Sequence, residues 1–319
     1  MNPLFLYACL FSLFAVMTVQ ALEKKRIIGG HRITRVALLL LLIIPFLLLL
    51  PKWHVLPSHS SISPWTEAAN QSTPLWLALL WLSGAAVCLT RLVLSAWHLR
   101  QWKKHSSTLN DPATLALLQD CSEKQGFKRP VEIRALSASG GPAACGWWHP
   151  VIYLPVEWSQ WPQATLRAVL LHEVGHHVSR DPLWRLVSLL GTSLHWYNPC
   201  VHWLSRRLDL QSEVVCDARV IRSGFRKDQY AHILCDLASQ GPYAAVAMAS
   251  PSGLEWRVRQ LGHIHFPLTR WWWFVLVVAL FLCAFCLSVL RPARDPGTPV
   301  PPSAEDAALR HQANPFPLD

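Results

Sequence analysis

Four long apolar segments constrain this chain more than any other feature of its sequence. They run from residue 2 to 22, from 33 to 50, from 75 to 97 and from 271 to 290. A helix needs about 20 mainly apolar residues, and at least about 17, to cross a bilayer. Of the 319 residues, 52% are hydrophobic and only 15% are charged, which is too apolar for a simple soluble domain. The sequence therefore predicts a polytopic membrane protein with four transmembrane helices.

The positive charges predict how these segments are oriented. The loop after the first segment carries five Lys or Arg residues against one acid, Glu23, whereas residues 51–74 carry one of each sign. Residues 98–270 carry 19 Lys or Arg against 13 acidic residues. Since Lys and Arg accumulate in cytoplasmic loops, we expect the first loop and residues 98–270 to be cytoplasmic and both termini to be outside.

This topology divides the chain into four parts. Residues 1–97 hold three transmembrane helices, residues 98–270 a cytoplasmic domain, residues 271–290 the fourth transmembrane helix, and residues 291–319 a short Pro-rich external tail. The net charge of +10 lies largely beside the membrane segments, where anionic lipid accounts for it. We find no nucleic-acid-binding module, so no direct nucleic-acid partner is expected.

The stretch His172-Glu173-Val174-Gly175-His176 has the most definite chemistry in the chain. An apolar run from Leu166 to Leu171 precedes it and predicts a helix. On a helix, residues four apart lie about 40° apart around the axis, so His172 and His176 can bind one Zn²⁺. Glu173 is offset by about 100° and can accept a proton from the water that attacks a peptide carbonyl.

Two histidines and a water leave a tetrahedral zinc site one protein ligand short. Glu213 is the best candidate for this ligand. Asp217, four residues later, can accept a hydrogen bond from the second nitrogen of a ligand histidine. Without the upstream motif, this pair would be typical of a solvated helix face.

The segments around the motif predict a mainly helical α+β domain with a small β-sheet. We expect a helix at 113–125, a strand at 131–135, and a second strand or hairpin at 143–155. Asp181-Pro182 predicts that a new helix starts, with Asp181 as its N-cap, after the motif helix ends near Arg180. Asn198-Pro199 predicts a break between two helices, rather than a fifth membrane span, within residues 183–204.

The segment from Ala143 to Pro155 lies directly before the motif helix. An edge strand can bind a peptide by adding it to the sheet as a further strand. Gly146, Trp147 and Trp148 are therefore candidate substrate-binding residues. A core strand is the alternative, and the two tryptophans could equally be core or membrane-interface aromatics.

Three motifs together resemble the signature series of the BlaR/MecR-type antirepressor metallopeptidases. They are His172-Glu173-x-x-His176 with Asp181, then Trp196-Tyr197-Asn198-Pro199, then Glu213-x-x-Cys216-Asp217. The resemblance implies a zincin-like domain with one Zn²⁺ per chain on the cytoplasmic side of a bacterial inner membrane. It also implies cleavage of a cytoplasmic transcriptional repressor and of the protein itself.

The resemblance leaves several points open. A C-terminal penicillin-binding sensor domain is not expected here, since about 29 residues follow the last segment, so the activating signal is not identified. Arg257 to Arg259 belong to a basic juxtamembrane helix or, alternatively, to a self-cleavage position. A homodimer is compatible with the sequence. The alternative functions are a membrane-protein quality-control protease of HtpX type and a non-proteolytic signalling or scaffold protein with structural zinc.

Overall fold

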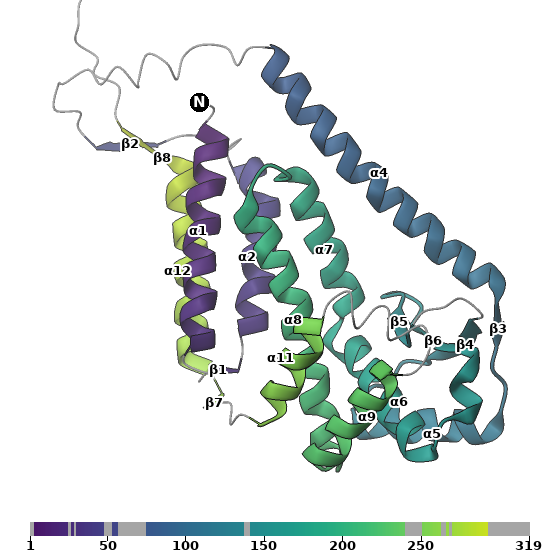
Figure 1. The fold of residues 1–319 in the computed structure, drawn as a ribbon. Coiled ribbons are helices and arrows are strands. Elements are labelled where there is room, and N and C mark those ends of the chain that lie inside the picture. The colour runs from purple at the N-terminus through teal and green to yellow at the C-terminus, as the bar shows by residue number, and fades with distance from the viewer. Residues whose placement is uncertain are drawn as a thin grey trace, which may run out of the picture.

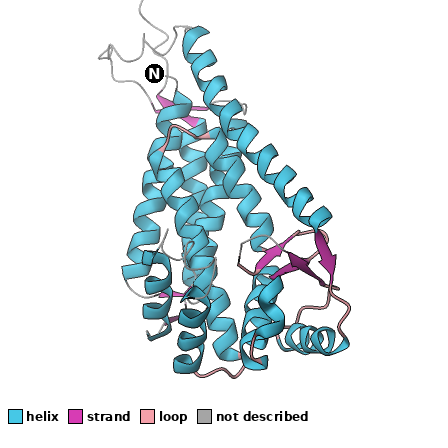
Figure 2. Cartoon of the chain, turned by 45° about the vertical axis from the view of Figure 1, so that its right-hand side comes forward, coloured by secondary structure: helices cyan, strands magenta, loops and turns pink. Residues whose placement is uncertain are grey.

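The computed structural model describes residues 3–24, 27–28, 30–47, 53–56, 75–136, 141–239, 251–262, 266–267 and 270–292. Figure 1 shows a bundle of long helices joined to a smaller domain that contains a sheet. The fold is mostly helical, and Figure 2 shows how small a part the strands make of it. Residues 293–319 of the predicted external tail, residues 137–140 and residues 240–250 lie outside the described residues.

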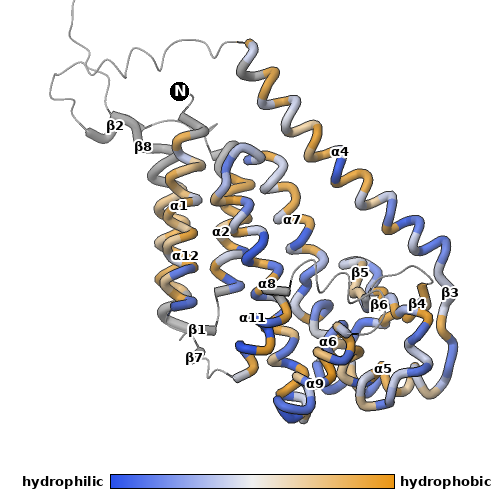
Figure 3. The backbone as a smooth tube through the Cα atoms, viewed as in Figure 1, coloured by the Kyte–Doolittle hydropathy of each residue, from blue (hydrophilic) through white to orange (hydrophobic). Residues whose placement is uncertain are grey.

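The bundle contains α1 (Pro3–Lys24), α2 (Gly30–Leu47), α7 (Asp181–Leu194), the first part of α8 (Pro199–Arg222) and α12 (Arg270–Val289). Its buried core includes Phe11, Ile33, Leu38, Leu41, Val201, Leu204 and Leu280. Figure 3 shows that α1 and α12 are hydrophobic along most of their length. Short parallel pairings of β1 (Ile27–Ile28) with β7 (Phe266–Pro267) and of β2 (Trp53–Leu56) with β8 (Leu290–Pro292) join distant parts of the chain.

Two of the described helical segments are long and apolar enough to cross a membrane. They are Leu6–Lys24 within α1 and Leu79–His105 within α4 (Leu75–His105). A shorter apolar segment, Phe274–Ala284, lies within α12. Helices α2 and α12 cover most of the second and fourth predicted segments, but the four-span topology stays a prediction.

Helix α4 stands at an angle to the bundle, as Figure 1 shows. Most of its apolar side chains are exposed. It contacts the turn between α7 and α8, where Trp81 and Trp196 each donate an indole N–H to a backbone carbonyl. A Cβ atom at Gly84 would lie 2.2 Å from the ring of Trp196. Only glycine therefore allows α4 to approach this turn so closely.

The domain contains a four-stranded sheet in the order β3-β4-β6-β5. The strands are β3 (Ser106–Thr108), β4 (Glu132–Leu136), β5 (Ala143–Cys145) and β6 (Val151–Pro155). Strands β4 and β6 are parallel, and the two outer pairings are antiparallel. Because β5 is last in the strand order, it is an edge strand. A 3₁₀ helix (Val156–Gln160) follows β6, and α5 (Pro112–Lys124), α6 (Gln163–Ser179), α9 (Lys227–Ser239) and α11 (Pro251–Gly262) complete the domain.

Most of the local predictions are confirmed. The predicted helix at 113–125 is α5, the predicted strand at 131–135 is β4, and residues 143–155 form the antiparallel pair β5 and β6. Asn198 caps α8, because its side chain accepts a hydrogen bond from the backbone N–H of Cys200. The predicted N-cap at Asp181 is wrong. Arg180 occupies that position, and Asp181 is the first residue of α7, which frees its carboxylate for another contact.

Candidate metal centre

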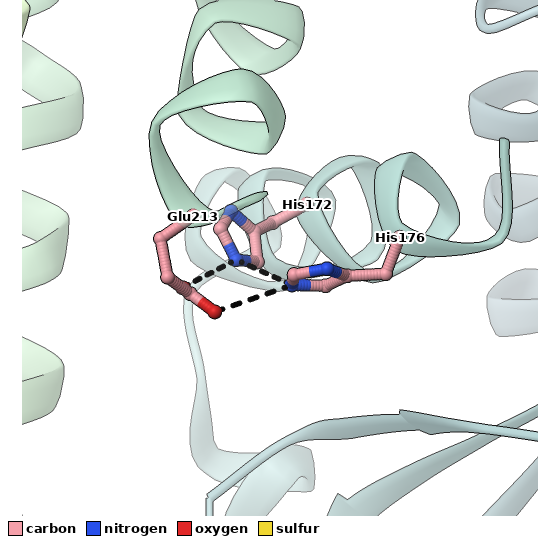
Figure 4. Close-up of side chains that lie close together, drawn as sticks. All are labelled: His172, His176 and Glu213. Atoms are coloured by element: carbon pink, nitrogen blue, oxygen red, sulfur yellow. Dashed lines mark hydrogen bonds and ion pairs between the residues drawn. The ribbon is translucent and has the colours of Figure 1, made fainter. Parts of the chain in front are cut away.

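Three side chains from two helices converge at the end of α6, as Figure 4 shows. His172 and His176 project from one face of α6, and their Nε2 atoms lie 3.2 Å apart. Glu213 reaches them from α8, with its oxygens 3.3 Å from Nε2 of His172 and 3.7 Å from Nε2 of His176. The structure thus brings together the three residues that the sequence predicted as metal ligands.

The spacing of these donor atoms fits one tetrahedral Zn²⁺. Ligand atoms about 2.0–2.1 Å from such an ion lie about 3.3 Å from one another, which is close to the three distances found. Two imidazoles and a carboxylate also form a donor set that is typical of catalytic zinc, with the fourth position left for water. A second group, His176, Asp181 and Cys216, contains one histidine only, and its aspartate is already paired with that histidine.

Close packing of α6 on α8 produces this convergence. Gly175, inside the motif, faces α8, and a Cβ atom there would lie 3.3 Å from Sγ of Cys216. The missing side chain lets the two helices approach at the point from which Glu213 extends. Helix α8 joins both hydrophobic cores, with Leu204 in the bundle and Val220 in the domain. Glu213 therefore lies where the bundle meets the domain.

A carboxylate orients each histidine from its far side. Oδ1 of Asp217 lies 3.1 Å from Nδ1 of His172, which is the role that the sequence suggested for Asp217. Oδ2 of Asp181 lies 2.8 Å from Nδ1 of His176. A carboxylate on Nδ1 favours the tautomer that leaves Nε2 free to bind a metal. Both histidines thus present Nε2 to the same point.

Burial and charge set the ionisation of this cluster when no ion is bound. Burial lowers the pKa of His172, but hydrogen bonds to Asp217 and Glu213 outweigh it and raise that pKa to about 10. Burial would raise the pKa of Glu213, but the hydrogen bond to His172 and the charge of Arg257 hold it well below its usual range. The same is true of Asp217, where Arg257 contributes most. Both acids are therefore charged at neutral pH.

Two further residues contact the cluster and were not predicted to do so. The hydroxyl of Tyr230, on α9, donates to Oδ1 of Asp217 over 2.7 Å and lies 3.2 Å from Nδ1 of His172. The guanidinium of Arg257, on α11, donates to both oxygens of Asp217 and lies 3.1 Å from an oxygen of Glu213. No spacing rule links these positions to the motif, so only the fold reveals them.

Glu173 is buried, with 6% of its surface exposed, on helix α6, which packs against β5. Burial raises the pKa of the Cys145 thiol in β5 to about 11, and the negative charge of Glu173 adds to this effect. Glu173 directly follows His172 in α6 and thus lies beside a candidate ligand.

The segment that follows β5 forms one wall of a pocket of about 320 Å³. Gly146 has a positive φ of 76°, and a Cβ atom there would lie 2.2 Å from the carbonyl oxygen of His149, so the turn requires glycine. Trp147 and Trp148 follow it, are 44% and 65% exposed, and pack edge to face. The pocket is also lined by Phe127, Arg129, Pro150, His177, Arg180, Pro182 and Leu183.

Comparison with known proteins agrees with this arrangement. The family model described as BlaR1 peptidase M56 matches residues 56–261. The regulatory protein BlaR1 of Bacillus licheniformis is 28% identical over 144 residues, which cover 45% of this chain and 24% of that protein. The methicillin resistance mecR1 protein of Staphylococcus aureus (strain Mu50 / ATCC 700699) is 25% identical over 148 residues, which cover 46% of this chain and 25% of that protein.

The regulatory protein BlaR1 of Staphylococcus aureus is 23% identical over 183 residues, which cover 56% of this chain and 30% of that protein. The chain therefore matches less than a third of the length of each of these relatives. The family match is broader, since it includes more than half of the chain and every residue of the candidate metal centre described above. The resemblance noted in the sequence is thus confirmed, and the chain belongs to the BlaR1 peptidase M56 family, a family of metallopeptidases.

Proposed function

We propose that the protein is an integral-membrane zinc metalloendopeptidase whose metal ligands are His172, His176 and Glu213. The observation that carries this proposal is the convergence of two imidazole nitrogens and one carboxylate at distances suited to a single tetrahedral ion. Glu173, beside them on α6, supports a catalytic site rather than a structural one, because a structural site has no need of a base.

Each residue has a defined task in this proposal. Bound Zn²⁺ would supply a Lewis acid that lowers the pKa of water and polarises the peptide carbonyl. Glu173 accepts the proton of the attacking water and later donates it to the leaving amine. Asp217 and Asp181 hold the rings of His172 and His176 in the tautomer that binds metal.

The substrate peptide binds, in this proposal, along the edge strand β5. Its backbone would add to the sheet in extended form, because the outer edge of β5 is not paired among the described residues. Gly146, Trp147 and Trp148 lie at the end of this strand, and the pocket behind the tryptophans can receive a substrate side chain. The position of β5 against α6, which carries Glu173, supports this assignment.

We further propose that the biological substrate is a cytoplasmic transcriptional repressor, and that the protein can also cleave itself. The names of two relatives, regulatory protein and methicillin resistance protein, support a role in regulation. The proposed topology has membrane helices at 2–22, 33–50, 75–97 and 271–290, with residues 98–270 in the cytoplasm of a bacterium and both termini outside. The family match and the two long apolar helices support a membrane location.

The test compares new protein N-termini in cells that express the wild-type chain with those in cells that express Glu173→Ala. Glu157→Ala, which changes an exposed glutamate in the 3₁₀ helix, is the matched control. New termini within a DNA-binding repressor, present with wild type and Glu157→Ala only, support the proposal. Termini scattered over damaged membrane proteins indicate quality control of the HtpX type instead. Equal termini with all three chains, when the wild type is zinc-loaded, indicate a non-proteolytic role.

A further inference from the structure

Each aspartate that orients a histidine is itself held by an arginine from a helix outside α6 and α8. Arg35, on α2, donates to Oδ1 of Asp181. Arg257, on α11, donates from Nε and from a terminal nitrogen to the two oxygens of Asp217, over 2.9 and 2.7 Å. The contacts therefore form two chains, Arg35–Asp181–His176 and Arg257–Asp217–His172, which we call the two arginine relays.

We propose that Arg35 and Arg257 are positioning residues of the metal centre, which fix the two orienting carboxylates and, through them, the rings of His176 and His172. This inference rests on the proposed metal site, and it adds a function for two residues that lie far from the motif in sequence. Arg35 also lies outside residues 56–261, the part of the chain that the family model matches.

The relay through Arg257 is nearly closed to solvent. The side chain of Asp217 is 2% exposed and that of Arg257 is 19% exposed. The two parallel N–H···O contacts use the planar fork of the guanidinium, which fixes both the position and the plane of the carboxylate. A third contact, 3.1 Å from Arg257 to Oε2 of Glu213, reaches a proposed ligand directly. Arg257 thus contacts the ligand Glu213 directly and supports the ligand His172 through Asp217.

The relay through Arg35 is equally buried. Its side chain is 11% exposed, that of Asp181 is 10% exposed, and the guanidinium lies 5.4 Å from the ring centroid of Trp184. Ser212, on α8, also donates to Oδ1 of Asp181, over 3.2 Å. The carboxylate is therefore held from α2 and from α8 while its other oxygen pairs with His176.

Two effects of removing an arginine oppose each other. The loss of a positive charge near the site would by itself strengthen the binding of a cation. The loss of the guanidinium would also leave a buried carboxylate without its cation, which is strongly unfavourable. The carboxylate would then turn toward water and away from its histidine. We expect the second effect to dominate, because both arginine–aspartate pairs are largely buried from solvent and their contacts are short.

The relays also connect the site to the bundle. Arg35 lies on α2, which is one of the bundle helices, and α11, which carries Arg257, directly precedes the bundle helix α12 in the chain. Any shift of α2 or α11 against α6 and α8 must change a contact of an orienting aspartate. The metal-binding histidines are thus sensitive to the arrangement of the bundle.

The experiment measures zinc affinity by competition with a chelator, using the full chain in detergent, for Arg257→Gln, Arg257→Lys, Arg35→Gln and Arg35→Lys. Arg207→Gln is the matched control, because Arg207 on α8 makes an equally close, two-bond contact to Glu23 of α1 but touches no orienting aspartate. We expect about a tenfold to hundredfold loss of affinity for both Gln variants, the range seen when residues behind a metal ligand are changed. Lysine keeps the charge but not the fork, so the Lys variants should also bind zinc more weakly than wild type.

Co²⁺ substitution supplies a second measurement, since the visible absorption of Co²⁺ reports the geometry of its ligands. We expect a changed spectrum for the relay variants and an unchanged one for Arg207→Gln. In an Asp217→Asn background, Arg257→Gln should lower the affinity less than it does in the wild type, and the remaining effect should come from its contact with Glu213. Arg35→Gln should likewise lower the zinc affinity less in an Asp181→Asn background than it does in the wild type.

Three results would overturn the inference. They are wild-type or tighter zinc binding by the Gln variants, an equal loss in Arg207→Gln, and a full effect of Arg257→Gln in the Asp217→Asn background. If the wild-type chain itself binds no zinc, the proposed function fails together with the relays. If the wild type binds zinc and the relay variants match it, only the relays fail.

Discussion

The Nδ1 atom of His176 lies 2.8 Å from Oδ2 of Asp181, five residues further along the chain. This contact forms because α6 ends at Ser179 and Arg180 adopts a left-handed conformation with φ of 58°. The chain therefore turns sharply, and the first residue of α7 faces back toward the last turn of α6. A residue that resembles a helix cap in the sequence thus supports a metal ligand instead.

Asp181→Asn should lower zinc affinity by about tenfold to a hundredfold, because an amide is a weaker acceptor for the Nδ1 proton of His176 than a carboxylate. Competition with a chelator measures this affinity. Asp209→Asn, which changes a half-exposed aspartate of α8 that pairs with Arg185, is the control and should bind zinc as wild type does. Equal affinity of the two variants would contradict the role of Asp181.

Variants of Glu173 and Glu213 should show separately which residue is needed for catalysis and which for metal binding. Glu173→Gln should keep one zinc per chain and lower kcat by about 10²–10⁴-fold, since it removes the base but no proposed ligand. Glu213→Gln should lose zinc as well as activity, because it removes the carboxylate that lies 3.3 Å from Nε2 of His172. Metal analysis of the purified variants, together with their rates of peptide cleavage, checks both statements. Loss of zinc from Glu173→Gln would place that residue among the ligands.

Zinc removal should destabilise the protein, because the proposed ligands come from two different helices and the ion joins them. A ligand at 100 times its Kd stabilises the folded state by about 2.7 kcal/mol, so a strong chelator should lower the Tm of the wild type. His172→Ala should show no such shift when chelator or zinc is added. A chelator-dependent Tm in His172→Ala would mean that zinc binds elsewhere.

Gly175 controls the distance between α6 and α8. Gly175→Val should destabilise the fold by about 1–3 kcal/mol and weaken zinc binding, since the added atoms meet Cys216 and push away the helix that carries Glu213. Gly262→Val is the control, because a Cβ atom at Gly262 has no neighbour within 4 Å among the described residues. Chemical unfolding measures stability, and adding Cys216→Ala should restore part of the loss. No recovery in the double variant would argue against this contact.

Trp148 tests the proposed peptide site at the end of β5. Trp148→Ala should raise KM and leave kcat nearly unchanged, because this exposed ring lines a pocket whose lining includes none of the proposed ligands. Val156→Ala, which changes an exposed apolar residue of the 3₁₀ helix, should change neither constant. A fall in kcat at constant KM would contradict a role confined to binding.

The sequence by itself determined the local features of this protein. The spacing of His172 and His176 predicts one face of a helix, and both lie on one face of α6 with their Nε2 atoms 3.2 Å apart. Asn198-Pro199 predicts a helix start, and Asn198 caps α8. Such features are readable because they depend on residues within a few positions of one another. The family signature was readable for the same reason, since its motifs are short and local.

The tertiary structure alone decided which distant side chains complete the centre. Arg35 is 146 positions from Asp181, and Arg257 is 40 positions from Asp217, so neither pairing has a spacing that could predict it. Tyr230 likewise reaches His172 only because α9 packs beside α6 in the domain core. A buried carboxylate requires a cation and hydrogen-bond donors wherever the fold can supply them. Packing of whole helices, rather than local pattern, therefore selected these partners.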